Sequence, residues 1–230
     1  MSHGLVSIVM PVFNGRTFLA DTLRSVACQS HPFVERIAVD DGSTDDSPEM
    51  LARHGGWQVT RGGHAGPNHA RRTAIESARG EFVAFLDQDD IWHADHLASC
   101  LESLRRHPDA PAAAARRRKF TDTGMLRLSG RVGSPRRHDP WAFFPFQLID
   151  TPSMVVVRRT ALDAIGGWPV EGGATADCLA WWRLAARGTF VVPASRTVGV
   201  RETPSSMSAL GRRAPGPCLA NLLDTALTAT

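Results

Sequence analysis

An apolar run leads directly into a cluster of acids in the first half of the chain. Phe82-Val83-Ala84-Phe85-Leu86 predicts a buried strand, and Asp87-Gln88-Asp89-Asp90 follows it at once. Carboxylates this close raise one another's pKa unless a cation lies among them. Hard oxygen ligands of this kind suit Mg²⁺ or Mn²⁺, which often hold substrate phosphates as well. The pattern indicates a metal–diphosphate site at the end of a strand. The alternative is an Asp-rich turn that caps the following helix.

A second acidic loop follows another short apolar run. Ile37-Ala38-Val39 predicts a strand, and Asp40 and Asp41 come directly after it. In open α/β sheets, the loops at the carboxyl ends of the strands converge on one ligand crevice. Asp45 and Asp46 are expected only to cap the next helix. Asp40 and Asp41 precede the loop glycine, and we expect them to face a ribose hydroxyl, a base N–H or a metal.

Strands and helices alternate along the first half of the chain. Residues 5–10 and 57–60 are strand-like runs, and the stretches after them have helical periodicity. Between 57–60 and a helix expected over 68–79 lies a glycine-rich loop, residues 62–67. That loop lacks both the Gly-x-Gly-x-x-Gly spacing and a Gly-Lys-Ser/Thr end, so neither a Rossmann dinucleotide loop nor a P-loop is supported. The order predicts an α/β fold with a mostly parallel sheet flanked by helices.

The second half has weaker signals. Strands are expected near 112–115, 153–157 and 190–192, and helices over 159–165 and 177–187; a polar loop over 127–140 and an aromatic stretch at 141–146 lie between them. We predict one domain over residues 1–205. Its nucleotide-binding half would be 1–110 and its acceptor-binding half 111–205, with a tail over 206–230 that contains a short helix.

Composition excludes several classes of protein. The net charge of +3 is too small to imply nucleic acid by itself. The four cysteines contain no Cys-x-x-Cys pair, which disfavours zinc and disulfides and favours a reducing cytoplasm. No apolar run approaches the roughly 18 residues of a membrane span. The strand-like start argues against a signal peptide. The basic run Arg116–Lys119 could face phosphates or an anionic membrane surface, but a solvated face is favoured.

Several segments, in this order, resemble the family-2 inverting glycosyltransferases with the GT-A fold. They are Ser7-Ile8-Val9-Met10-Pro11-Val12-Phe13-Asn14, Val39-Asp40-Asp41-Gly42-Ser43-Thr44-Asp45, Ala70-Arg71 with Gly80-Glu81, and Phe85-Leu86-Asp87-Gln88-Asp89-Asp90. Gly166-Gly167-Trp168, Asp177 and Trp181-Trp182-Arg183-Leu184-Ala185 resemble the later signature of that family. The resemblance covers about residues 5–200. It implies a GT-A fold, which is a Rossmann-like, mixed but mostly parallel sheet.

The resemblance implies a nucleotide pocket. Pro11, Val12 and Asn14 would line it. Asp41 would hydrogen-bond the base, usually uracil. Arg71 would lie near the base or the phosphates.

The resemblance also implies a metal site and a catalytic base. Asp89 of the Asp-x-Asp motif would bind Mn²⁺ or Mg²⁺ directly. Asp87 would bind the ribose or the water shell of the metal. Asp90 would cap the next helix. Asp177 falls where the family places its catalytic base.

Three positions depart from the family pattern. Ala176 stands before Asp177 where Glu is frequent, and Arg72 stands where Asn is usual. Thr203 occupies the place of a His that in many members helps to hold the metal and the diphosphate, so we expect closure over the donor to differ. The absence of a Gln-x-x-Arg-Trp motif and of membrane spans argues against a processive polysaccharide synthase.

The expected reaction is metal-dependent transfer of one sugar from a nucleotide-sugar, with a UDP-sugar as the first candidate, to an acceptor hydroxyl. The acceptor could be a saccharide, a lipid-linked saccharide or a small natural product. One alternative is a sugar nucleotidyltransferase, but Pro11–Asn14 does not supply its glycine-rich loop with a catalytic Arg or Lys. Another is a degenerate member that binds a nucleotide-sugar without turnover. A nucleic-acid binder based on Arg116–Lys119 is the weakest, so no nucleic-acid partner is expected, and membrane contact is at most peripheral.

Overall fold

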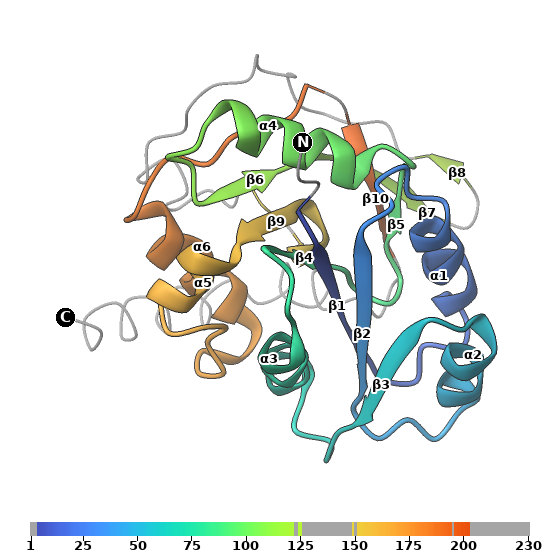
Figure 1. Ribbon diagram of the computed structural model, residues 1–230. Helices are drawn as coiled ribbons and strands as arrows, with labels where there is room; N and C mark the ends of the chain where they lie inside the picture. The colour runs from blue at the N-terminus through green and yellow to red at the C-terminus, as the bar shows by residue number, and fades with distance from the viewer. Residues whose placement is uncertain (1–3, 122–123, 126–148, 150, 195, 203–230) are drawn as a thin grey trace.

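The computed structural model describes residues 4–121, 124–125, 149, 151–194 and 196–202 (Figure 1). The predicted loop at 127–140, the aromatic stretch at 141–146 and the tail, which includes Thr203, lie outside the described residues. The described part is built around one mixed sheet with helices packed against it.

The central sheet has six strands in the order β3-β2-β1-β4-β9-β6. Their bounds are β1 Val6–Val12, β2 Val34–Asp40, β3 Trp57–Arg61, β4 Phe82–Phe85, β6 Ala112–Ala114 and β9 Val155–Arg158. Strands β1 to β4 pair in parallel, whereas β9 is antiparallel to both β4 and β6. The parallel strands therefore end at one edge of the sheet, and their loops meet there.

The helices are amphipathic and cover the sheet. They are α1 Leu19–Ala27, α2 Ser47–His54, α3 Pro67–Ser77, α4 His96–Arg106, α5 Arg159–Ala164 and α6 Ala176–Ala185, with 3₁₀ turns η2 Pro152–Met154 and η3 Gly173–Thr175. Helix α3 packs on β1 and β2, and α4 packs on β6 and β9. None of the helices in the described ranges is long and apolar enough to cross a bilayer.

Strand β1 extends further than the sequence indicated. The strand-like run was expected over residues 5–10, yet β1 continues to Val12 and Pro11 pairs with Val39 of β2. Successive residues of a strand point their N–H and C=O groups to opposite sides. The Val12 carbonyl accepts from Asp41 on the β2 side, so the missing N–H of Pro11 faces β4, whose pairing with β1 ends at Val9. The proline therefore costs the sheet no hydrogen bond.

A second, smaller sheet was not predicted. Its order is β5-β10-β7-β8, with bounds β5 Ile91–Trp92, β10 Arg196–Arg201, β7 Arg116–Thr121 and β8 Gly124–Met125. The basic run lies in β7, and of its side chains only Arg118 is fully exposed. Lys119 Nζ lies 2.6 Å from a carboxylate oxygen of Glu202. The expectation of a freely solvated run was therefore wrong for most of it, because pairing with β10 partly buries these side chains.

Candidate active site

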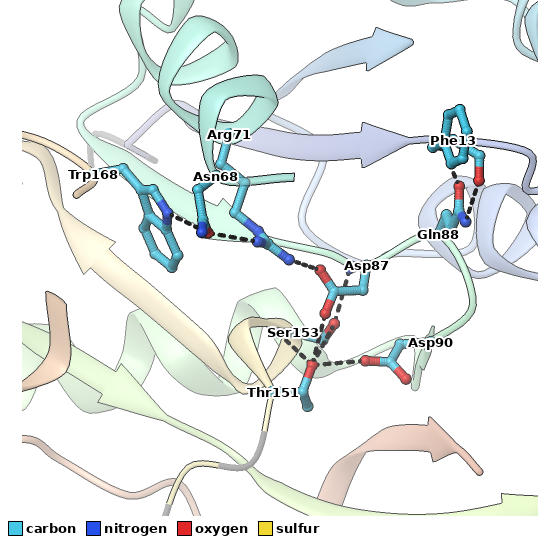
Figure 2. A network of polar contacts seen from close by, with 9 residues as sticks. All are labelled: Phe13, Asn68, Arg71, Asp87, Gln88, Asp90, Thr151, Ser153 and Trp168. Carbon is cyan, nitrogen blue, oxygen red and sulfur yellow. Dashed lines mark hydrogen bonds and ion pairs between the residues drawn. The ribbon is translucent and has the colours of Figure 1, made fainter. Parts of the chain in front are cut away.

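The acids after β4 lie in a polar network centred on Asp87 (Figure 2). One Asp87 oxygen forms an ion pair with Arg71 of α3. The other lies 3.0 Å from Thr151 Oγ1, and the Asp87 N–H donates to Ser153 Oγ at 2.9 Å. Both hydroxyls come from the segment before β9. The second half of the chain therefore helps to hold the acidic loop of the first half.

Asp90 was expected to cap a helix, and the structure contradicts this. Strand β5 follows it, and the N-cap of α4 is Asp95. The Asp90 carboxylate is buried, lies 3.0 Å from Thr151 Oγ1 and accepts from the Arg201 N–H at 3.2 Å. Burial raises the pKa of Asp90 well above its ordinary value. Since Thr151 has a single hydroxyl proton for Asp87 and Asp90, a protonated Asp90 would complete the hydrogen bonding.

Asp89 is the acid that remains available to a cation. Burial, followed by the charge of Asp87, raises the pKa of Asp89 to about 6. Among the described residues, no other side chain donates a hydrogen bond to its carboxylate, while its own backbone N–H lowers the pKa and its carbonyl accepts from Arg201 Nε at 3.3 Å. A half-buried carboxylate that lies beside another and has no partner side chain to donate to it is an environment that a divalent ion stabilises.

The donor set therefore fits Mg²⁺ or Mn²⁺ held mainly by Asp89. Asp87 already serves Arg71 and Thr151, which suits contact with the ion through water. Within the described ranges, no three His, Cys, Asp or Glu side chains are arranged to hold an ion by themselves. This arrangement suits Mg²⁺, which usually takes one or two carboxylates and completes its shell with water and substrate phosphates.

Arg71 is held beneath the acids by three neighbours. Its side chain is buried, and its guanidinium lies 5.4 Å from the centre of the Trp168 ring as well as against Asp87. Asn68, one helical turn earlier, accepts from Arg71 at 3.4 Å and from the Trp168 indole at 3.2 Å. Its amide donates to the Gly173 carbonyl at 2.7 Å. This chain of contacts runs from α3 to the turn that precedes α6.

Asp177 lies in the first turn of α6 and reaches the same network. Burial raises its pKa, while the positive charge of Arg71 lowers it and the negative charge of Asp87 raises it. Charges act on one another in this way only when they are close. One carboxylate oxygen accepts from the Cys178 N–H at 2.8 Å. Asp177 therefore experiences the charges of Arg71 and Asp87, although it is about 90 residues from Asp87 in the sequence.

Asp41 holds the glycine-rich loop. It is buried, and its two carboxylate oxygens accept from the N–H groups of Ala65 at 2.9 Å and Gly66 at 2.7 Å. Each carboxylate oxygen can accept a second hydrogen bond. Asp41 can therefore bind a base N–H while it shapes the loop beneath it.

The predicted nucleotide-pocket residues lie at the end of β1. Pro11 and Val12 are buried in the strand, so their backbone would form part of the wall of a nucleotide pocket. Asn14 is exposed and has a left-handed backbone with a φ of 48°. Its side chain accepts from the Thr44 N–H at 2.8 Å, and its own N–H donates to Ser43 Oγ. Asn14 therefore joins the β1 loop to the β2 loop.

The sequence did not reveal the hydrogen bonds that several side chains form in this site, namely those of Asn68, Gln88, Thr151, Ser153 and Arg201. They are neutral or basic side chains whose partners are distant in the sequence, so no local pattern marks them. Only Gln88 carried a signal, through its place between two acids of the motif.

The family is shown by a sequence comparison. The model described as "Glycosyl transferase family 2" matches residues 7–166. The chain belongs to glycosyl transferase family 2. Among curated proteins it is 42% identical over 105 residues to the "Putative teichuronic acid biosynthesis glycosyltransferase TuaG" of Bacillus subtilis, covering 44% of this chain and 42% of TuaG. It is 32% identical over 174 residues to the "Putative glycosyltransferase EpsH" of the same species, covering 71% of this chain and 50% of EpsH. The chain thus spans half or less of these two relatives.

Solved structures show the same fold. A crystal structure of S. aureus TarS 1-349 in complex with UDP-GlcNAc matches with a TM-score of 0.75 at 19% identity, over 89% of this chain and 60% of that one. The mannosyltransferase PcManGT from Pyrobaculum calidifontis, in complex with GDP-Man and Mn²⁺, matches with a TM-score of 0.69 at 19% identity, over 93% and 61%. The expected family and the mixed, mostly parallel GT-A architecture are confirmed.

Proposed function

We propose that this chain is an inverting glycosyltransferase that moves one sugar from a nucleotide-sugar to an acceptor hydroxyl with a divalent metal. Asp177 is its general base, and the residues up to about 110 bind the donor. A UDP-sugar is the first candidate donor. The site would work in the cytoplasm, with at most peripheral contact with a membrane.

The observation that carries this proposal is the ion pair of Asp87 with Arg71, on a helix whose Asn68 is hydrogen-bonded to the turn before Asp177. Asp87 follows β4, Arg71 lies on α3, and Asp177 begins α6. The ion pair joins the first two, and the charges of both act on the pKa of the third. In-line displacement at a sugar carbon requires a cation that holds the leaving phosphates on one side of that carbon and a base on the other, and Arg71 and Asp177 are the residues that we assign to these two roles.

The transfer follows from these positions. The acceptor hydroxyl gives its proton to the Asp177 carboxylate as its oxygen bonds to the anomeric carbon. The bond from that carbon to the diphosphate oxygen breaks on the opposite side, and the nucleoside diphosphate leaves with the electron pair. The configuration of the sugar is therefore inverted. The raised pKa of Asp177 makes it a better base near neutral pH.

Stabilising the leaving diphosphate requires positive charge. Arg71 would supply part of it through a hydrogen bond to a phosphate oxygen. A divalent ion held by Asp89, with Asp87 beside it, would supply electrophilic stabilisation of the diphosphate. Asp41 would accept a hydrogen bond from the base, and the end of β1 would flank it.

The names of similar proteins support a nucleotide-sugar as donor and a saccharide or lipid-linked saccharide as acceptor. The TarS structure contains UDP-GlcNAc. The Escherichia coli relative WfgD, 35% identical over 100 residues, is named a UDP-Glc:alpha-D-GlcNAc-diphosphoundecaprenol beta-1,3-glucosyltransferase. For this chain we propose a saccharide or lipid-linked saccharide as acceptor, with a small natural product as the remaining class.

A thermal-shift screen of nucleoside diphosphates and nucleotide-sugars tests the proposal. Each ligand is measured with Mn²⁺, with Mg²⁺ and with EDTA. We expect one nucleoside diphosphate to raise the Tm only with metal, since a ligand that binds the folded state at about 100 times its Kd stabilises it by about 2.7 kcal/mol. A flat response to every nucleotide with both metals would overturn the proposal.

A further inference from the structure

Gln88, the residue between Asp87 and Asp89, binds the backbone of another loop. Its Oε1 accepts from the Phe13 N–H at 2.8 Å, and its Nε2 donates to the Phe13 carbonyl at 2.9 Å (Figure 2). Phe13 lies directly after β1, between Val12 and Asn14. One side chain of the acidic loop therefore fixes both backbone groups of a residue in the predicted nucleotide pocket.

The chemistry of this contact is specific for an amide. The Phe13 N–H needs an acceptor and its carbonyl needs a donor, and a glutamine side chain offers one of each. A carboxylate of the same size would place an oxygen against the Phe13 carbonyl. A thioether of similar size would form neither strong hydrogen bond. The orientation of the Gln88 amide is thus set by Phe13.

Gln88 is also the bridge between two loops that are otherwise held separately. The β1 loop is tied to the β2 loop, through Asn14 to Ser43 and through the Gly15 N–H to Ser47 Oγ at 2.8 Å. The acidic loop is held by Thr22 of α1, whose hydroxyl lies 2.8 Å from the backbone carbonyls of both Gln88 and Asp90. Among the described residues, no other hydrogen bond joins residues 13–16 to residues 87–90.

We propose that Gln88 is a positioning residue that couples metal binding at the acidic loop to nucleotide binding at the end of β1. This inference rests on the proposed function. An ion that fixes Asp89 also fixes the neighbouring Gln88, and the amide then fixes the Phe13 peptide beside the pocket. A nucleotide that orders the β1 loop acts on the acids along the same route, because such coupling is reciprocal.

Isothermal titration calorimetry measures this coupling directly. UDP and GDP are each titrated into the protein with Mn²⁺ and with EDTA, and Mn²⁺ is titrated with and without the nucleotide. For the wild type we expect Mn²⁺ to tighten nucleotide binding by a factor of about 5–150, the usual range of coupling between two sites. Part of that factor comes from the metal–diphosphate contact itself. The portion carried by Gln88 is the coupling factor of the wild type divided by that of the Gln88 variant.

Gln88→Met removes both hydrogen bonds at nearly constant size and without a new charge. We expect the coupling factor to fall by about tenfold, which corresponds to about 1.4 kcal/mol and matches the loss of one or two ordinary hydrogen bonds. The Tm without ligands should stay near that of the wild type, since Thr22 still holds the loop backbone. Gln58→Met, at an exposed position of β3, is the matched control and should leave the coupling factor unchanged.

A second variant reaches the same contact from the other side. A Cβ added at Gly15 would lie 2.5 Å from Gln88 Oε1, so Gly15→Ala displaces the amide without changing residue 88. It should lower the coupling factor as Gln88→Met does. If both variants keep the wild-type coupling factor, the role of Gln88 is wrong while the proposed function stands. If the wild type binds neither nucleotide with or without Mn²⁺, the proposed function fails and this inference fails with it.

Discussion

The Asn68 amide donates a hydrogen bond of 2.7 Å to the Gly173 carbonyl, and this bond joins α3 to the turn that carries Asp177. Gly173 begins the 3₁₀ turn that runs directly into α6. The same Asn68 side chain accepts from Arg71 and Trp168 through its oxygen. One residue therefore sets the distance between the cation of the predicted donor site and the predicted base.

Asn68→Ala and Asn68→Asp both remove the donor to Gly173, but only the alanine variant also removes the acceptor for Trp168. We expect both to lower kcat by about 10- to 100-fold, because a small misplacement of a catalytic group is enough for such a loss. Steady-state kinetics with the donor found by the thermal screen measures this. His69→Ala, at an exposed neighbouring position of α3, is the control. A normal kcat in both Asn68 variants would show that the bond does not position Asp177.

Asp177→Asn should nearly abolish transfer and leave donor binding intact. The amide keeps the size of the side chain but cannot take the acceptor proton, and general-base catalysis contributes about 10²- to 10⁴-fold. Transfer rates and calorimetric binding of the donor, measured on one preparation, separate the two effects. Asp163→Asn, on an exposed position of α5, should match the wild type in both. Full activity in Asp177→Asn would remove the assignment of the base.

Asp89→Ala should abolish metal-dependent donor binding. Its carboxylate is the one in the acidic loop that receives no hydrogen bond from another described residue, so we expect it to be the direct ligand of Mn²⁺. Calorimetry with UDP, with and without Mn²⁺, should show equal affinities in this variant. Asp163→Ala should keep the dependence on Mn²⁺ that the wild type shows. Metal-dependent binding that survives in Asp89→Ala would move the ion to another acid.

The parallel part of the fold was predictable because its strands are short apolar runs that end in polar loops. The runs near Ile8, Ala38 and Val83 all became strands of the central sheet. The second sheet was not predictable from such runs. Strand β7 consists largely of basic residues and β10 begins and ends with arginine, so neither has an apolar pattern. These strands form because they pair with each other across about 80 residues.

The candidate site was predictable to the extent that carboxylates mark it. Asp41, Asp87 and Asp89 were singled out because each follows a strand, and Asp177 through the family resemblance, and their roles stay predictions. Gln88 and Asn68 were missed because their partners are a backbone in another loop and a turn in the other half of the chain. A polar uncharged side chain in a loop looks solvated until the tertiary contact is known.

Gly80 shows a related difference between pattern and structure. It directly follows the helix expected over 68–79, but α3 ends at Ser77 and its C-cap is Ala78. The structure requires glycine because a Cβ at position 80 would lie 2.6 Å from the Ser7 backbone nitrogen and 2.7 Å from the Leu5 carbonyl oxygen. We expect Gly80→Ala to destabilise the protein by about 1–3 kcal/mol, as overpacking does. Urea unfolding measures this, with Gly63→Ala as the control, since a Cβ at Gly63 would meet nothing within 4 Å. Equal stability of both variants would contradict the close contact.

The metal-free protein should show a pH dependence of stability that belongs to Asp89. Burial and the charge of Asp87 raise the pKa of this carboxyl from 3.8 to about 6, so the folded state holds its proton more tightly than the unfolded state does. Its contribution to stability is therefore complete below about pH 4 and is lost as the pH rises through about 6. Asp89→Asn remains neutral throughout and escapes this loss. The Tm of Asp89→Asn minus that of the wild type, measured in EDTA, should rise between about pH 4 and pH 7 and then level off. Asp163→Asn should show no such rise, and a constant difference for Asp89→Asn would mean that Asp89 titrates as an ordinary surface acid.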